Sequence, residues 1–270
     1  MDDDFYDSLD HDYRLAGFQA ATTDIEDDFV QATLSDDMFV PLAAHHNGDG
    51  RHSYLLFYDR AATWDYPGKA EFVALHITKD PERATFDFDI QRAPVVPLAQ
   101  NWLIQRGCPP DATLVTPNHG PRPADALTSQ LEDMLRANPE HRYQIIDHYT
   151  DNPCTFDFGV EVRTLVNDHH PDSAPTPYRL FLQEVDKNLQ TYTVREGAFH
   201  SAEAADDWAT TRDAPLPLAP APDSNTTPRS QAARARTAGT RPTGLAVPPA
   251  AVAAPRTPPS AAPRPRGGTR

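Results

Sequence analysis

The fold is decided first by one stretch of the chain, residues 39–58, which reads FVPLAAHH-NGDG-RHSYLLFY. Two apolar segments flank the Asn-Gly-Asp-Gly turn, whose glycines supply the positive-φ positions that a tight β-hairpin needs. With Gly48 and Asp49 at the centre of the turn, His45 is expected directly opposite His52. Both faces of the hairpin carry apolar or aromatic side chains, so we expect both faces to be covered.

Apolar and alternating segments continue beyond this hairpin. Further strands are predicted at 71–77, 84–90, 141–149, 155–166, 178–185 and 190–195. Helices are predicted at 95–106, 123–137 and 202–212, and Ser201 is the expected N-cap of the last one. This order of elements predicts an α+β fold, in which largely antiparallel sheet or sheets are built from hairpins and meanders with a few packed helices.

Composition divides the chain of 270 residues into three unlike regions. Residues 1–37 hold twelve Asp and Glu against a single Arg, and we expect this acidic segment to pack partly on the body. Residues 38–212 form the expected globular body, as one domain or as two lobes at 38–137 and 141–212. Residues 213–270 contain 13 prolines, 14 alanines and no aromatic side chain. Such a segment buries too little apolar area to offset its ordering entropy, so we expect a disordered Pro/Ala/Arg-rich tail.

A faint repetition keeps the two-lobe alternative open. The pair His45-His46 is followed by Tyr54 at the same spacing at which the pair at 169–170 is followed by Tyr178. The segments 85–88 and 155–158 also match, but at a different offset. Chance resemblance between two meander sheets is the competing interpretation.

Several classes of protein are excluded or disfavoured. The two cysteines, Cys108 and Cys154, cannot build a disulfide framework or a four-thiolate zinc site. The chain has no run of 18 apolar residues, so no membrane contact is expected. Its start, MDDDF, lacks the basic and apolar regions of a signal peptide, and we expect a cytoplasmic protein. Glycine-rich nucleotide loops and the common hydrolase motifs are absent from the sequence, so no cofactor is expected.

The turn end of the hairpin is the main candidate for chemistry. Opposed histidines at 45 and 52 would have Cβ atoms about 5 Å apart, close enough for both imidazoles to bind one metal ion. Asp49 in the turn adds an oxygen ligand. A divalent metal held by His45, His52 and Asp49 would activate water, and a metal-dependent hydrolase is therefore the alternative function. A pair of histidines at a hairpin end is also ordinary polar surface, and Ser53 beside it has no sequence context typical of a nucleophile.

Other reactive side chains favour structural roles. Cys108 follows the end of a predicted helix and Cys154 opens a predicted strand, and neither place lowers the pKa of a thiol, so both are expected to be inert. In the strand at 84–90, the alternation predicts Ile90 inward and Asp87 and Asp89 outward, which is the ordinary way to solvate an exposed sheet face.

Charge decides the expected partner. The formal net charge of −15 repels nucleic acid from the body, whereas eight arginines in the tail would permit a weak contact with it. Acidic residues interleaved with apolar ones in the first region are typical of a segment that binds protein. The sequence therefore predicts a non-enzymatic binding or interaction protein, with an acidic α+β body, a flexible basic tail and a protein partner.

Overall fold

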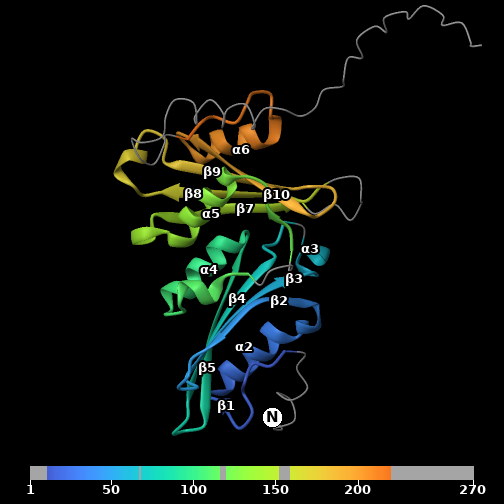
Figure 1. The fold of residues 1–270 in the computed structure, drawn as a ribbon, viewed down its shortest axis with the longest axis vertical. Coiled ribbons are helices and arrows are strands. Elements are labelled where there is room, and N and C mark those ends of the chain that lie inside the picture. The colour runs from blue at the N-terminus through green and yellow to red at the C-terminus, as the bar shows by residue number, and fades with distance from the viewer. Residues whose placement is uncertain (1–10, 67, 116–119, 152–158, 220–270) are drawn as a thin grey trace, which may run out of the picture. The chain divides into compact units, whose positions relative to one another are not determined.

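The computed structural model describes residues 11–66, 68–115, 120–151 and 159–219, and all of them belong to one compact unit. These residues form five α-helices and two five-stranded, mostly antiparallel sheets (Figure 1). The predicted α+β class with antiparallel meanders is therefore confirmed. Most of the predicted tail, from residue 220 onward, lies outside the described residues, as does the start of the acidic segment. Within the described part, none of the helices combines the length and apolar character needed to cross a membrane.

The first sheet is a four-stranded antiparallel meander with one short parallel strand at its edge. Its strands lie in the order β1-β5-β4-β3-β2, with the bounds β1 Gln19–Ala20, β2 Phe39–His46, β3 His52–Asp59, β4 Phe72–Asp80 and β5 Thr85–Ala93. Between and after these strands lie α2 Thr23–Thr33, the 3-10 helix η1 Asp36–Met38, α3 Ala62–Asp65 and α4 Val96–Gln105.

The second sheet repeats this plan. Its order is β6-β10-β9-β8-β7, with the bounds β6 Arg122–Pro123, β7 Tyr143–Asp151, β8 Glu161–Asp168, β9 Tyr178–Val185 and β10 Thr191–Phe199. The helices of this part are η2 Pro110–Thr113, α5 Ala126–Ala137, η3 Pro139–His141, η4 Pro171–Ser173 and α6 Ala202–Thr211. In both halves a short strand, a helix and a 3-10 turn precede the meander, and a helix follows it.

This repetition differs from the one seen in the sequence. The sequence match aligns Tyr54 of β3 with Tyr178 of β9, whereas the topology makes β3 equivalent to β8. The pair at 45–46 ends β2, but the pair at 169–170 follows β8, so the two histidine pairs occupy non-equivalent places. The second match cannot be compared, because residues 155–158 lie outside the described residues.

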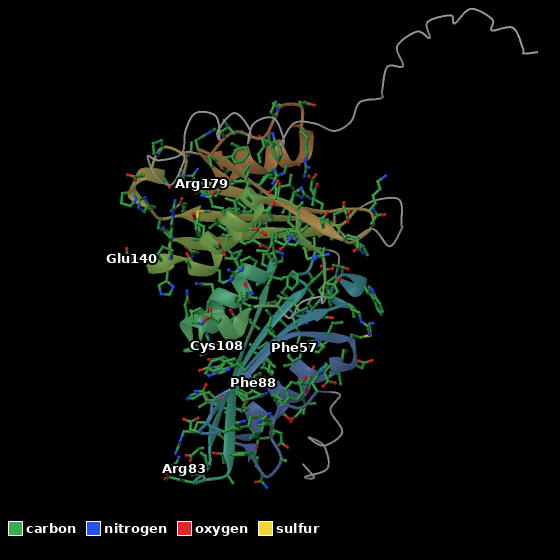
Figure 2. The ribbon with its side chains drawn as sticks, viewed as in Figure 1. Phe57, Arg83, Phe88, Cys108, Glu140 and Arg179 are labelled. Carbon is green, nitrogen blue, oxygen red and sulfur yellow. The ribbon has the colours of Figure 1, made fainter. Side chains whose placement is uncertain are left out.

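Helices cover both faces of each sheet because both faces are apolar. On one face of the first sheet, α2 inserts Phe29 into a core with Phe57 and Phe86 (Figure 2 labels Phe57). On the other face lies α4, and α4 packs on α5, which in turn covers the second sheet (Figure 1). The remaining face of the second sheet is covered by α6.

Polar side chains complete the contact between α4 and α5. Asn101 donates a hydrogen bond to the carbonyl oxygen of Arg136 at 2.9 Å, and the Arg136 guanidinium donates to Gln100 at 2.7 Å. Asn138, which ends α5 in the left-handed conformation, donates to Asn101 at 3.4 Å. The two halves are thus joined by an apolar core and by paired amides.

Local signals account for most helix ends. Ser201 caps α6 by accepting from the backbone N–H of Ala204, as expected, and Gly107 follows α4 with φ +98°. α2 was not expected, because its acidic sequence has only two fully buried positions, Phe29 and Thr33. Thr22 caps the helix at its N-terminus. The burial of Phe29 in the core provides the main tertiary stabilisation of this helix.

Two predictions about the extent of the apolar core are wrong: the orientation of Ile90 and the end of the folded chain. Ile90, which pairs with Leu75 on the face of the sheet that carries Phe86, is 38% exposed rather than inward. The ordered chain also continues beyond Arg212, where the folded part was expected to end. Leu216 is buried with Phe199, and Leu218 pairs with Gly197 of β10.

Gly197 makes room for this last segment. A Cβ atom at Gly197 would lie 2.5 Å from Cδ1 of Leu216. We expect Gly197→Ala to displace Leu216, which would expose the Ala198 amide that now donates to the oxygen of Pro217 at 3.2 Å. Hydrogen exchange at Ala198 should then be faster. Gly48→Ala is the control, since no atom lies within 4 Å of its Cβ position. Unchanged exchange at Ala198 would show that the segment does not depend on this space.

Candidate functional site

A histidine–tyrosine cluster lies on the α4-facing side of the first sheet, beyond the end of the helix. One cross-strand row runs through β2, β3, β4 and β5 and contains His45, Tyr54, His76 and Asp89. The rings of Tyr54 and His76 are stacked, with centroids 4.6 Å apart and an interplanar angle of 5°. The hydroxyl of Tyr54 donates a hydrogen bond to the carbonyl oxygen of Arg106 at 3.0 Å, which fixes the position of the tyrosine ring.

His52 joins this cluster through His76 and not through His45. Nδ1 of His52 lies 3.1 Å from Nε2 of His76, and the two ring planes differ by 16°. Burial is the main cause that lowers the pKa of His76, and the neighbouring His52 lowers it further. Both causes favour the neutral form of the His76 imidazole, whereas the Asp89 carboxylate acts in the opposite direction. His76 was not predicted as a site residue, although it is the polar position within the otherwise apolar segment 72–77.

The expected pairing of His45 with His52 is wrong. His45 faces Tyr54, because the turn closes between Asn47 and His52 and leaves four residues in the loop rather than two. A bulge between residues 41 and 43 shifts the register once more. Asp49, in the loop, accepts a hydrogen bond from the backbone of Arg51 at 2.9 Å.

The three proposed metal ligands are therefore not brought together as one group. Among the described residues, no three His, Cys, Asp or Glu side chains form a group that could hold a metal ion. The second histidine pair also has partners in its own part of the fold. His169 is hydrogen-bonded to Gln144 at 3.1 Å, and His170 accepts from the backbone of Asp172.

Ser53 has a buried polar environment that sequence reasoning missed. Its hydroxyl accepts a hydrogen bond from Nζ of Lys79 at 3.0 Å and lies 2.8 Å from Nδ1 of His46. Lys79 also donates to the carbonyl oxygen of Arg14 at 3.2 Å. Extending the alternation of Val73, Leu75 and Ile77 by two residues would have placed Lys79 inward.

The arrangement of Ser53, Lys79 and His46 resembles a nucleophilic serine with two neighbouring bases, but its serine and lysine are closed to solvent. Ser53 is 0% exposed and Lys79 is 4% exposed. Burial is the main cause that lowers the pKa of both Lys79 and His46. Because the lysine binds the backbone of Arg14, the network fastens the N-terminal segment to the sheet.

Cys108 is a buried thiol three residues after the end of α4 (labelled in Figure 2). It is 3% exposed, and burial raises its pKa to about 11. We expect native Cys154→Ser protein to resist alkylation by iodoacetamide at pH 8, because little thiolate is present and the sulfur is covered. Unfolding in urea should restore labelling at Cys108. Rapid labelling of the native variant would show that the residue is accessible and reactive.

Aromatic side chains are exposed where the two halves meet. Trp64 and Tyr66, on the connection between β3 and β4, are 64% and 67% exposed. Tyr149 of β7 is 40% exposed, and its ring lies against the backbone of Gly68, where a Cβ atom would be 2.6 Å from Cδ2. We call Trp64, Tyr66 and Tyr149 the aromatic patch.

Carboxylates dominate the exposed sides of the two outer helices. Asp24, Asp27 and Asp28 are exposed on α2, and Glu203, Asp206 and Asp207 are exposed on α6. Among the acids singled out earlier, Asp89 accepts a hydrogen bond from Arg106 at 3.2 Å. Asp87 accepts from the backbone of Phe88.

Comparison with protein-family models, with curated proteins and with solved structures gives no match to this chain. The function is therefore argued from the residues themselves.

Proposed function

We propose that this protein is a non-enzymatic interaction protein of the cytoplasm that binds a basic protein partner through the aromatic patch. The observation that carries the proposal is the exposure of Trp64 and Tyr66, two residues apart in the chain and each more than half accessible. Large aromatic side chains are unfavourable in water and are enriched among the residues that contribute most to protein interfaces.

The geometry of the patch supports a role in binding. Tyr149 belongs to the second half of the fold, whereas Trp64 and Tyr66 belong to the first, so the patch spans the junction. Arg163 lies over the ring of Tyr149 at 4.9 Å and Lys69 over the ring of Tyr66 at 5.5 Å. Beside these cations, Tyr66 stays 67% exposed and Tyr149 stays 40% exposed.

Charge supports a basic partner. The exposed carboxylates of α2 and α6 add to a chain whose net charge is −15. Such a surface accelerates the encounter with a positively charged protein and slows the encounter with nucleic acid. Salt should therefore weaken binding mainly by lowering the association rate.

The reactive side chains support binding rather than catalysis. Ser53 is fully buried, and the thiol of Cys108 is both covered and held protonated by its raised pKa. Each of these groups would need a rearrangement of the core before it could meet a substrate.

The test compares affinity capture by the full-length protein with capture by a Trp64→Ala/Tyr66→Ala double variant, at low and at high ionic strength. Leu34→Ala is the matched control, because Leu34 is 72% exposed but lies outside the aromatic patch. We expect a basic protein that is retained by the wild type and by the control, at least tenfold less by the double variant, and less by all three at high salt.

Equal retention by the double variant would remove the patch from the interface. Retention that does not respond to salt would instead contradict the proposed charge complementarity. Recovery of nucleic acid as the only ligand would overturn the proposal of a protein partner.

A further inference from the structure

The rings of His52 and His76 are held by their neighbours more firmly than a hydrogen bond between them requires. Both rings are fixed by packing on Tyr54, with centroid distances of 6.1 Å for His52 and 4.6 Å for His76. Tyr54 is fixed in turn by its bond to the backbone of Arg106. The two facing nitrogens are therefore held in place by side chains of β3 and β4 and by the backbone that follows α4.

The spacing of these nitrogens matches two ligands of one metal ion. An imidazole nitrogen lies 2.0–2.1 Å from zinc, so two nitrogens in one tetrahedral shell are about 3.3 Å apart. The observed distance between Nδ1 of His52 and Nε2 of His76 is 3.1 Å. An ion 2.0–2.1 Å from both nitrogens would lie to one side of the line that joins them, so both rings must turn until their lone pairs point at it.

The surroundings suit a cation that keeps water ligands. His52 is partly exposed, which opens one side of the pair to solvent, whereas His76 is 8% exposed. Asp89 lies directly opposite His76 on β5 and is an exposed carboxylate that compensates positive charge, although it is shared with Arg106.

We propose that His52 and His76 form a two-imidazole site for a divalent ion of the zinc, nickel and copper class. Imidazole nitrogen favours these ions over the hard ions magnesium and calcium. No third described His, Cys, Asp or Glu completes the group, so water fills the other positions of the ion. The site differs from the one expected from the sequence, since His76 takes the place of His45 and Asp49.

The test is a calorimetric titration of the full chain, free of any affinity tag, with zinc chloride and separately with magnesium chloride. We expect one saturable zinc site and no magnesium binding. His52→Gln and His76→Gln should each weaken zinc binding at least tenfold. His169→Gln is the matched control, because it removes another imidazole that is hydrogen-bonded to a glutamine side chain.

Thermal unfolding gives a second readout. An ion that binds only the native state raises Tm with its concentration. Zinc should therefore raise Tm for the wild type and for His169→Gln, but not for His52→Gln. His52 is partly exposed, so this variant is expected to fold even if His76→Gln does not.

Two results would overturn the proposal. One is a wild-type protein without a saturable zinc site, which would leave the pair as a hydrogen bond only. The other is zinc binding in His52→Gln at wild-type affinity, which would place the ion on other histidines of the chain.

Discussion

Replacing Asp168 by asparagine is expected to lower the free energy of unfolding by about 3–5 kcal/mol, because it breaks a buried ionic network. The Asp168 side chain is 0% exposed and is paired with two arginines. Arg142 donates to both of its oxygens at 2.7 Å, and Arg179 donates to one of them at 3.3 Å (Figure 2 labels Arg179). An asparagine would turn an NH₂ group toward these donors and remove the carboxylate that Arg142 and Arg179 share, which leaves Glu196 at 3.8 Å from Arg179 as the remaining paired carboxylate.

The measurement is urea unfolding of the wild type and of Asp168→Asn at neutral pH. Asp147→Asn is the matched control, since Asp147 is exposed on β7 and should change stability by less than about 0.5 kcal/mol. A loss below about 1 kcal/mol in Asp168→Asn would show that the network contributes little.

The same carboxylate predicts the response of the protein to acid. Burial raises the pKa of Asp168, but hydrogen bonds from Arg142, Ser173 and the backbone of His170 outweigh this and bring the pKa to about 2. Because this pKa is below the unfolded value of about 3.9, the stabilisation is complete above about pH 5 and is lost progressively as the pH falls through 4 to 2 and below. It corresponds to about 2–3 kcal/mol.

Unfolding at a series of pH values checks this. The difference in stability between the wild type and Asp168→Asn should be constant from pH 7 to pH 5 and should shrink below pH 4. A difference that stays constant down to pH 3 would mean that Asp168 does not titrate in this window.

The second large effect is expected for Phe29→Ala, which should cost about 3–5 kcal/mol. Phe29 is 0% exposed and makes edge-to-face contacts with Tyr13, Phe86 and Phe88 at centroid distances of 5.1–5.6 Å. Truncation leaves a cavity among rings from the N-terminal segment and from β5, and these cannot all close into it.

Leu34→Ala is the matched control for this substitution, because Leu34 is 72% exposed at the end of the same helix. It should change stability by less than about 0.5 kcal/mol. Similar losses for Phe29→Ala and Leu34→Ala in urea unfolding would mean that α2 does not contribute to the core.

The candidate site shows which inferences a sequence supports. The strands of the hairpin were placed nearly at their observed bounds, because alternation and the Asn-Gly-Asp-Gly turn are local. Which histidine faces which was not predictable, because one extra residue in a turn or a bulge changes every pair along both strands. His76 lies on β4, which is not part of the first hairpin, so the hairpin sequence alone could not place it beside His52.

Buried polar groups show the same limit. Lys79 is typical of a surface residue by its chemistry, yet it lies in the core because Ser53 and the backbone of Arg14 accept its hydrogen bonds. Likewise, the acidic α2 is a helix because Phe29 fills the first core, and Asp168 is tolerated inside because two arginines surround it. Each of these depends on residues far apart in the chain.

The sequence by itself determined the class of fold, the alternation of strands and helices, and several helix ends, such as the cap at Ser201 and the stop at Gly107. These follow from contacts within a few residues, which a local pattern encodes. Only the tertiary structure decided the register of the hairpin, the pairing of His52 with His76, the burial of Lys79 and the exposure of the aromatic patch. Those features arise where separate elements pack, and packing selects among partners that are equally compatible with the local pattern.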